Sequence, residues 1–214
     1  MHHSIVLFDF DGTLADTFET GAALINEFAG KFGYKTIDFA NSRNLSAREL
    51  VKLSGVKWWQ IPRLVRFFRK ESAKNANKIK PCKGVPEMLQ SIAQSADLGI
   101  LTTNSTATVE CFLRNNNLDG YFGYLKTGVP LFGKRRALSR SVRALRKMYS
   151  FVLYVGDEIR DIEACRKAGV DIISVSWGFN SNKVLAEANP FVAESANTLA
   201  TMIAERVKPY LALK

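Results

Sequence analysis

The sequence predicts an α/β protein: a doubly wound parallel sheet with helices on both faces, and a small all-helical domain inserted after the first strand. Two observations support this fold class. Apolar segments of strand length alternate with helical segments along most of the chain, which is typical of a parallel sheet buried on both sides. The stretch between the first two apolar segments breaks this alternation, because it contains helical patterns and no convincing strand.

The predicted strands are apolar runs with few polar residues before their ends. They cover residues 4–9, 97–103, 151–156 and 171–176, with a possible short strand at 124–127. The predicted helices cover residues 85–95, 106–116, 134–148 and 159–168. Gly169 follows the last of these helices as a stop signal.

The insertion is predicted to form a separate helical domain. Ser46 and Glu49 have the spacing of a capping box, which opens a short helix. Residues 57–76 form a second helical pattern, rich in aromatic and basic residues, and Pro81 and Gly84 mark the return to the sheet. The predicted division is therefore a core of residues 1–15 and 81–214 and a helical domain of residues 16–80.

Composition limits the function classes. The chain has 214 residues, 47% of them hydrophobic, so it can bury a sizeable core. Its net charge is +10, which suits anionic partners from phosphorylated metabolites to nucleic acid, although a solvated basic surface would have the same charge. No apolar run reaches the roughly 18–20 residues of a membrane span, so no membrane segment is expected.

The chain is expected to be cytoplasmic. Its N-terminus enters the first strand directly, without the charged and apolar regions of a signal peptide. Cys82, Cys111 and Cys165 are few and widely spaced, which is typical of reduced, mostly buried thiols.

The end of the first strand carries two carboxylates. Asp9 and Asp11 are two apart, so their side chains can point to one site, and Gly12 permits a tight turn close to a ligand. Two carboxylates this close repel each other unless a cation or a shared proton joins them. Mg²⁺ suits such oxygen ligands, whereas a calcium loop would continue with further acids. The alternative is that both acids cap a turn.

A second acidic cluster follows the strand at 151–156. Asp157 lies at the strand end, and Asp161 lies one helical turn later on the same side. Asp157 could instead be an N-cap of the helix that follows. Since two strands end in acid at one edge of the sheet, a shared site is favoured.

Hydroxyl, amide and amino groups could complete a phosphate site. Thr102, Thr103, Asn104 and Ser105 follow the second strand at a helix N-terminus, where phosphate binds readily. Lys134 opens a later helix and could neutralise phosphate charge. Each feature also has an ordinary structural explanation, as a helix cap or a solvated lysine.

Together these motifs resemble the haloacid dehalogenase superfamily of phosphatases, in particular its phosphoglycolate-phosphatase-like branch with a helical cap after the first motif. The matching segments, in order, are FDFDGTLADT, GILTTNS, GKRRAL and VGDEIRD, and the resemblance spans nearly the whole sequence. It implies a Rossmann-like core and an Mg²⁺-dependent phosphoric monoester hydrolase. Asp11 argues against the dehalogenase branch, which lacks the second acid of the first motif.

The resemblance also implies roles for these residues. Asp9 would attack phosphorus and form an aspartyl-phosphate, while Asp11 would act as general acid and then general base. Mg²⁺ would be held by the Asp9 carboxylate, the Asp11 main-chain carbonyl and Asp157.

Phosphate binding is implied for Thr103, Asn104 and Lys134, although Thr102 competes with its neighbour Thr103 for this role. Asp161 resembles a supporting acid outside the metal ligands, as does Glu158.

The insertion then resembles a mobile cap that closes over the site. Its basic and aromatic residues are either substrate contacts or the ordinary faces of an amphipathic helix, and the second explanation is favoured for any single residue. The residues concerned are Lys57, Trp58, Trp59, Arg63, Arg66, Phe67, Phe68, Arg69 and Lys70.

Other functions fit the sequence less well. Residues 128–135 nearly match a phosphate-binding P-loop, but Arg135 replaces the hydroxyl that would bind Mg²⁺. The only histidines are His2 and His3, which argues against a histidine nucleophile or a histidine-rich metal site. A catalytically inactive relative that binds anionic or nucleic-acid partners is the second hypothesis. The expected partner is a small phosphorylated metabolite, with nucleic acid not expected, and the sequence selects neither the substrate nor the oligomeric state.

Overall fold

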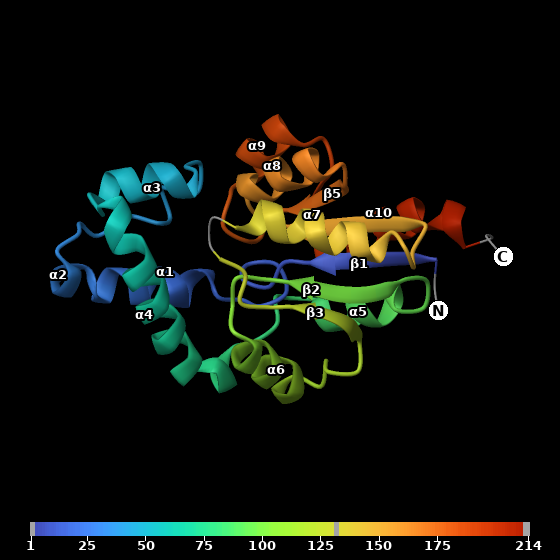
Figure 1. Cartoon of the computed structure of the whole chain (residues 1–214), viewed down its shortest axis with the longest axis horizontal. Coiled ribbons are helices and arrows are strands. Elements are labelled where there is room, and N and C mark those ends of the chain that lie inside the picture. Colours follow the sequence, from blue (N-terminus) through green and yellow to red (C-terminus); the bar gives the residue numbers. More distant parts are fainter. Residues whose placement is uncertain (1–2, 131–132, 212–214) are drawn as a thin grey trace.

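The computed structural model describes residues 3–130 and 133–211. Within these residues the centre of the molecule is a six-stranded, all-parallel sheet with the order β3-β2-β1-β4-β5-β6 (Figure 1). The strands are β1 (Ser4–Phe8), β2 (Asp97–Leu101), β3 (Phe122–Lys126), β4 (Phe151–Gly156), β5 (Asp171–Val175) and β6 (Val192–Ala193). This is the doubly wound, Rossmann-like order, and it confirms the predicted fold class.

Helices cover both faces of this sheet. They are α5 (Val85–Ile92), α6 (Thr106–Asn115), α7 (Lys134–Leu145), α8 (Ile159–Ala168), α9 (Asn182–Ala188) and α10 (Ala196–Val207). Apolar residues of α5, α6 and α10 pack on one face, and those of α7, α8 and α9 pack on the other.

The alternation of side chains along β1 shows why both faces need cover. Val6 and Phe8 belong to the core under α5, α6 and α10, while Ile5 and Leu7 belong to the core under α7 to α9. Successive strand residues point to opposite faces, so a strand that is apolar throughout must be covered twice. Strand β1 is therefore packed on both faces, and this packing fixes the position of the residues that follow it.

The insertion forms a helical unit beyond the carboxyl ends of the strands (Figure 1). It contains α1 (Phe18–Glu27), α2 (Ala29–Phe32), α3 (Ala47–Ser54) and α4 (Ile61–Lys74), with short 3₁₀ turns at Trp58–Gln60 and Ala76–Lys78. Ala29, Tyr34 and Leu64 form its own small core. The chain leaves and re-enters the sheet side by side, because the Asp16 N–H donates to the Lys80 carbonyl at 2.9 Å.

Most predicted elements are present, with shorter bounds. The capping box of Ser46 and Glu49 forms at the start of α3. The helix predicted over residues 57–76 starts only at Ile61, after a 3₁₀ turn, and Pro62 lies in its first turn, where its missing N–H costs nothing. The elements β6, α9 and α10 were not predicted.

The three cysteines are free thiols, as predicted, with Cys82 and Cys165 buried and Cys111 half-buried. Among the described residues, no helix is long and apolar enough to cross a membrane.

Candidate active site

Asp9 lies at the centre of the sheet edge, directly after β1. Its N–H donates to the Val155 carbonyl of β4 at 2.8 Å, which ties it to the neighbouring strand. Its carboxylate accepts a hydrogen bond from the Phe10 N–H at 2.8 Å and contacts Lys134 Nζ at 2.5 Å. Burial raises the pKa of Asp9, and the charge of Lys134 opposes this rise.

Asp11 is held by two side chains from different parts of the fold. Its carboxylate accepts hydrogen bonds from Thr17 Oγ1 at 3.0 Å and from Asn104 Nδ2 at 2.9 Å. Burial and the charge of Asp9 raise the pKa of Asp11 to about 6, while the Thr17 hydrogen bond lowers it. A carboxyl group with this pKa can hold or release a proton near neutral pH, as a general acid and base must.

Asp157 follows β4, the neighbour of β1. Its two carboxylate oxygens accept hydrogen bonds from Thr13 Oγ1 at 2.9 Å and from the Phe179 N–H at 2.7 Å. Asp157 is therefore not the N-cap of α8; that position is taken by Glu158. Burial and the nearby charges of Glu158 and Asp9 raise the pKa of Asp157 strongly.

Lys134 and Asp161 form a buried ionic cluster with Asp9. Lys134 Nζ lies 2.5 Å from Asp9 Oδ2 and 2.5 Å from Asp161 Oδ1, although the second contact lacks the direction of a hydrogen bond. Burial lowers the pKa of Lys134, but the charges of Asp161 and Asp9 outweigh it, so the net shift is upward. The lysine stays charged and fixes the Asp9 carboxylate.

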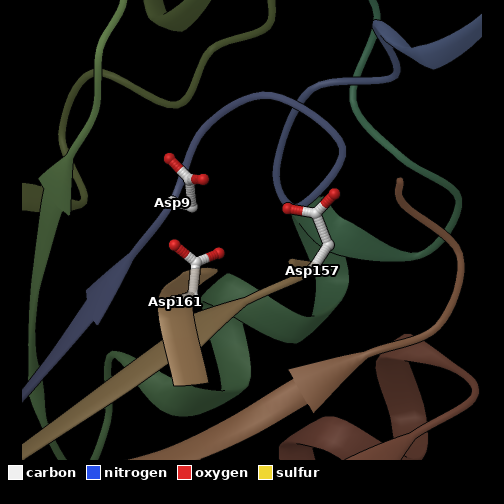
Figure 2. Close-up of side chains that lie close together, drawn as sticks. All are labelled: Asp9, Asp157 and Asp161. Carbon is white, nitrogen blue, oxygen red and sulfur yellow. The ribbon is translucent and has the colours of Figure 1, made fainter. Parts of the chain in front are cut away.

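The side chains of Asp9, Asp157 and Asp161 converge (Figure 2). One carboxylate oxygen of each lies within 4.8 Å of the others, and all three residues are buried. Asp9 and Asp157 come from the ends of β1 and β4, where the strand order reverses, which is the usual ligand position in such sheets.

The local charge favours a cation. In the described part of the chain, the carboxyl groups of Asp9, Asp11, Asp157, Glu158 and Asp161 form ion pairs with two basic side chains: Lys134 pairs with Asp9 and Asp161, and Arg160 pairs with Glu158. Oxygen donors with surplus negative charge are the surrounding that Mg²⁺ prefers. The residues present therefore fit this ion.

The main-chain carbonyl of Asp11 is also available as a ligand. None of the described residues donates a hydrogen bond to it, whereas the carbonyl of Phe10 accepts bonds from Leu14 and Ala15. The Asp11 carboxylate is taken up by Thr17 and Asn104 instead.

The predicted phosphate residues have different surroundings. Thr102 is fully buried, and its hydroxyl accepts a hydrogen bond from the Asn104 N–H at 3.0 Å. Thr103 lines the cavity described below, whereas Thr102 does not. The Asn104 side chain donates to Asp11, and Lys134 contacts Asp9.

A cavity of about 520 Å³ lies between the insertion and the sheet edge. The core contributes acids, small polar groups and one aromatic ring: Asp11, Gly12, Thr103, Asn104, Asp157, Glu158 and Phe179. The insertion contributes apolar residues and glycine, namely Phe18, Gly21, Ala22, Leu24, Ile25, Phe39, Val65, Phe68 and Ile79. It also contributes polar and charged residues, namely Asp16, Thr17, Thr20, Arg69, Glu71, Ser72, Asn75 and Lys78. The cavity thus has a polar, acidic floor on the core side and a roof of mixed apolar and polar residues on the insertion side.

Of the basic and aromatic residues that the sequence singled out in the insertion, only Phe68 and Arg69 line this cavity. Trp58 and Trp59 are 77% and 61% exposed and lie outside it. The members of that set on α4 agree with the preferred explanation, because an amphipathic helix shows only one face to the cavity. Trp58 and Trp59 fit neither explanation, because they lie in a 3₁₀ turn and are exposed.

Sequence analysis missed several supporting residues. Thr13 and Phe179 donate hydrogen bonds to Asp157, and Thr17 donates one to Asp11. Phe18 and Phe39 line the cavity. Thr13 and Thr17 lie within the first motif segment, FDFDGTLADT, so their hydroxyls were a usable signal. Phe179 acts through its main-chain N–H, which no residue type reveals.

The family profile of the haloacid dehalogenase-like hydrolases matches residues 6–175, which is most of the chain. The chain belongs to this family. The match includes all four motifs and agrees with the resemblance found in the sequence.

The proteins similar in sequence to this chain include phosphoglycolate phosphatases. The chain is 38% identical over 189 residues to a phosphoglycolate phosphatase of Synechococcus elongatus, an alignment that covers 86% of this chain and 89% of the relative. It is 25% identical over 201 residues to a phosphoglycolate phosphatase of Pseudomonas syringae pv. tomato, covering 87% and 74%. This haloacid dehalogenase-like hydrolase is thus a phosphoric monoester hydrolase by class, and the inactive binding protein is not favoured.

Solved structures show the same fold. A predicted phosphatase from Clostridium acetobutylicum superimposes with a TM-score of 0.79 at 21% identity, covering 96% of this chain and all of the other. CbbY from Rhodobacter sphaeroides in complex with phosphate has a TM-score of 0.67 at 20% identity, covering 92% and 95%.

The near-match to a P-loop is described only in part. Residues 131 and 132 of that segment lie outside the described residues, as does His2. Its lysine, Lys134, is buried between Asp9 and Asp161.

Proposed function

We propose that this hydrolase is an Mg²⁺-dependent phosphatase that cleaves a small phosphate monoester through an aspartyl-phosphate on Asp9. The observation that carries the proposal is the pairing of two carboxyl groups with different surroundings at one strand end. Asp9 contacts a charged lysine, while Asp11 has a pKa of about 6 and faces the cavity. This difference suits a nucleophile beside a general acid and base.

The proposed reaction has two steps. A carboxylate oxygen of Asp9 bonds to phosphorus while the bond from phosphorus to the ester oxygen breaks, and Asp11 gives its proton to the leaving oxygen. A water molecule then gives a proton to Asp11 and bonds to phosphorus, and the bond to Asp9 breaks to release inorganic phosphate. Thr17 and Asn104 orient Asp11 in both steps through their hydrogen bonds.

The proposed ligands of Mg²⁺ are the Asp9 carboxylate, the Asp11 main-chain carbonyl and Asp157. When bound, the ion would neutralise the charge that develops on the phosphoryl oxygens. Asp161 supports this set through Lys134. Thr103, Asn104 and Lys134 are the proposed contacts of the phosphoryl group, and Thr103 is preferred over Thr102 because only Thr103 borders the cavity.

Residues 16–80 are proposed to act as a cap on a core of residues 1–15 and 81–214. The roof of the cavity belongs to this segment, and its apolar residues from α1 and α4 would help to exclude water from the phosphoryl group. The first candidate substrate is phosphoglycolate, because two relatives are named phosphoglycolate phosphatase. We infer a cytoplasmic enzyme of small phosphorylated metabolites.

The test is phosphate release from phosphoglycolate and a panel of sugar and nucleotide monophosphates. The wild-type protein should release phosphate with Mg²⁺ and lose this activity in a chelator. Asp9→Asn should keep the fold, as seen by circular dichroism, and lose several orders of magnitude in kcat. Activity in chelator, or turnover by Asp9→Asn close to the wild-type rate, would refute the proposal.

A further inference from the structure

The insertion forms several hydrogen bonds with one loop of the core. This loop covers residues 176–181, after β5, and is called the β5 loop here. The Arg43 guanidinium, from the insertion, donates to the carbonyls of Ser176 at 3.1 Å and Gly178 at 2.5 Å. The Arg43 carbonyl in turn accepts bonds from the Ser181 N–H at 3.0 Å and from Asn180 Nδ2 at 3.0 Å.

The β5 loop also donates hydrogen bonds to Asp157. The Phe179 N–H donates to Asp157 Oδ2 at 2.7 Å, and the Asn180 N–H donates to the Asp157 carbonyl at 3.2 Å. Gly178 packs directly against the Asp157 side chain, so closely that a methyl group in its place would overlap the carboxylate.

One peptide unit joins the two sets of contacts. Arg43 holds the Gly178 carbonyl, and Asp157 accepts from the Phe179 N–H, which is the other end of the same planar group. Fixing the carbonyl therefore fixes the direction of the N–H. The bond to a guanidinium also polarises the peptide and strengthens its donation to the carboxylate.

We propose that Arg43 is a positioning residue for Asp157, acting through the Gly178–Phe179 peptide unit, so that docking of the insertion and Mg²⁺ binding stabilise each other. This inference rests on the proposed function, since it takes Asp157 as a metal ligand. Residues that orient a ligand in this way typically change metal affinity about 10- to 100-fold when removed. Coupling between two sites is reciprocal in binding free energy, so each event should strengthen the other.

The geometry of the contacts suits an arginine. Two nitrogens of the guanidinium reach the loop: Nη2 donates to the carbonyls of Ser176 and Gly178, and Nε donates to the carbonyl of Phe179 at 3.4 Å. The Cζ atom of Arg43 lies 5.3 Å from the centre of the Phe18 ring. Lysine has a single charged nitrogen and lacks the planar fork of a guanidinium. The main-chain contacts of Arg43 do not depend on its side chain, so a variant can keep the insertion docked and still lose control of the peptide unit.

The experiment is calorimetric titration of Mg²⁺ alone into substrate-free Arg43→Ala, Arg43→Lys and the wild-type protein. The matched control is Arg48→Ala, which removes an exposed arginine of the same segment. Arg43→Ala should raise the Kd for Mg²⁺ about tenfold, and Arg43→Lys should raise it by a smaller factor. Arg48→Ala should leave the Kd for Mg²⁺ unchanged. The Mg²⁺ concentration for half-maximal phosphate release should shift in parallel. Wild-type affinity in Arg43→Ala would overturn the inference.

Hydrogen exchange on the wild-type protein tests the same coupling without a variant. Saturating Mg²⁺ should slow amide exchange in residues 39–45 of the insertion as well as in the β5 loop. Slowing in the β5 loop alone would overturn the inference and leave the proposed function intact. A wild-type protein that neither binds nor requires Mg²⁺ would overturn both.

Discussion

Single side chains set the electrostatics of the site. Five carboxyl groups share two basic partners, and burial is the main reason why the pKa of Asp9, Asp11 and Asp157 is raised. Lys134 is the one described cation that contacts two of these acids. Its loss would remove the ion pairs that Asp9 and Asp161 form in the described residues and leave only the more distant charge of Arg160.

Lys134→Ala should therefore lower both stability and activity. Breaking a buried ion pair from one side costs about 3–5 kcal/mol, because the remaining charges stay buried without a partner. Lys74→Ala is the control: Lys74 pairs with Glu71 but its side chain is 60% exposed, so the cost should stay below about 1 kcal/mol. Urea unfolding in a chelator measures both. Equal losses of unfolding free energy in the two variants would show that the buried ion pair is no more stabilising than the exposed one.

At the scale of elements, the β5 loop has little room beside Asp157. Gly178→Ala would push a methyl group into the carboxylate, which should cost about 1–3 kcal/mol in unfolding free energy and raise the Mg²⁺ requirement. Gly30→Ala in α2 is the matched control, because no atom lies near its added methyl group and a helical glycine is unfavourable by about 0.5–1 kcal/mol. A normal Mg²⁺ requirement in Gly178→Ala, measured by phosphate release, would contradict the packing argument.

Helix α4 should influence the choice of substrate through one face only. Arg69 lines the cavity and donates to the Val129 carbonyl at 2.8 Å, whereas Arg66 on the same helix is exposed. Arg69→Ala should lower kcat/KM for phosphoglycolate by about 10- to 100-fold, as expected for a lost charged hydrogen bond. It should affect p-nitrophenyl phosphate much less. Arg66→Ala should change neither. Equal losses on both substrates by Arg69→Ala would refute a role in specificity.

The elements themselves were predictable to different degrees. Strands β1 and β4 are apolar throughout and end in acid, so both their burial and the position of Asp9 and Asp157 followed from the sequence. Strand β6 has only two residues, Val192 and Ala193, and its short length gives no periodic signal. The order of the insertion's side chains around the cavity depends on how α4 is rotated, and residue type does not determine that rotation.

The candidate site divides in the same way. Acids, lysine and hydroxyls in recurring positions can be predicted, because their chemistry is in the side chain. The Phe179 N–H and the Arg43 contacts to the β5 loop could not, because main-chain donors and acceptors are the same at every residue. Arg43 and its partners in the β5 loop are also over 130 positions apart in the chain. Such contacts depend on tertiary structure alone.

At the scale of the whole molecule, the sheet order brings the parts of the site together. β1 and β4 are neighbours although about 140 residues separate them, and the insertion leaves the chain directly after the first acidic motif. Folding of the core therefore brings together the proposed nucleophile, the proposed metal ligands and the two ends of the insertion. The central claim is that chemistry occurs at Asp9 within this assembly.

Acid quenching during turnover tests that claim most directly. The wild-type protein is mixed with Mg²⁺ and substrate, quenched within the turnover time, digested and analysed by mass spectrometry. One phosphoryl group should be found on the peptide that contains Asp9, with fragmentation locating it on Asp9 rather than Asp11, and Asp9→Asn should carry none. A phosphoryl group on another residue, or wild-type turnover by Asp9→Asn, would contradict the account.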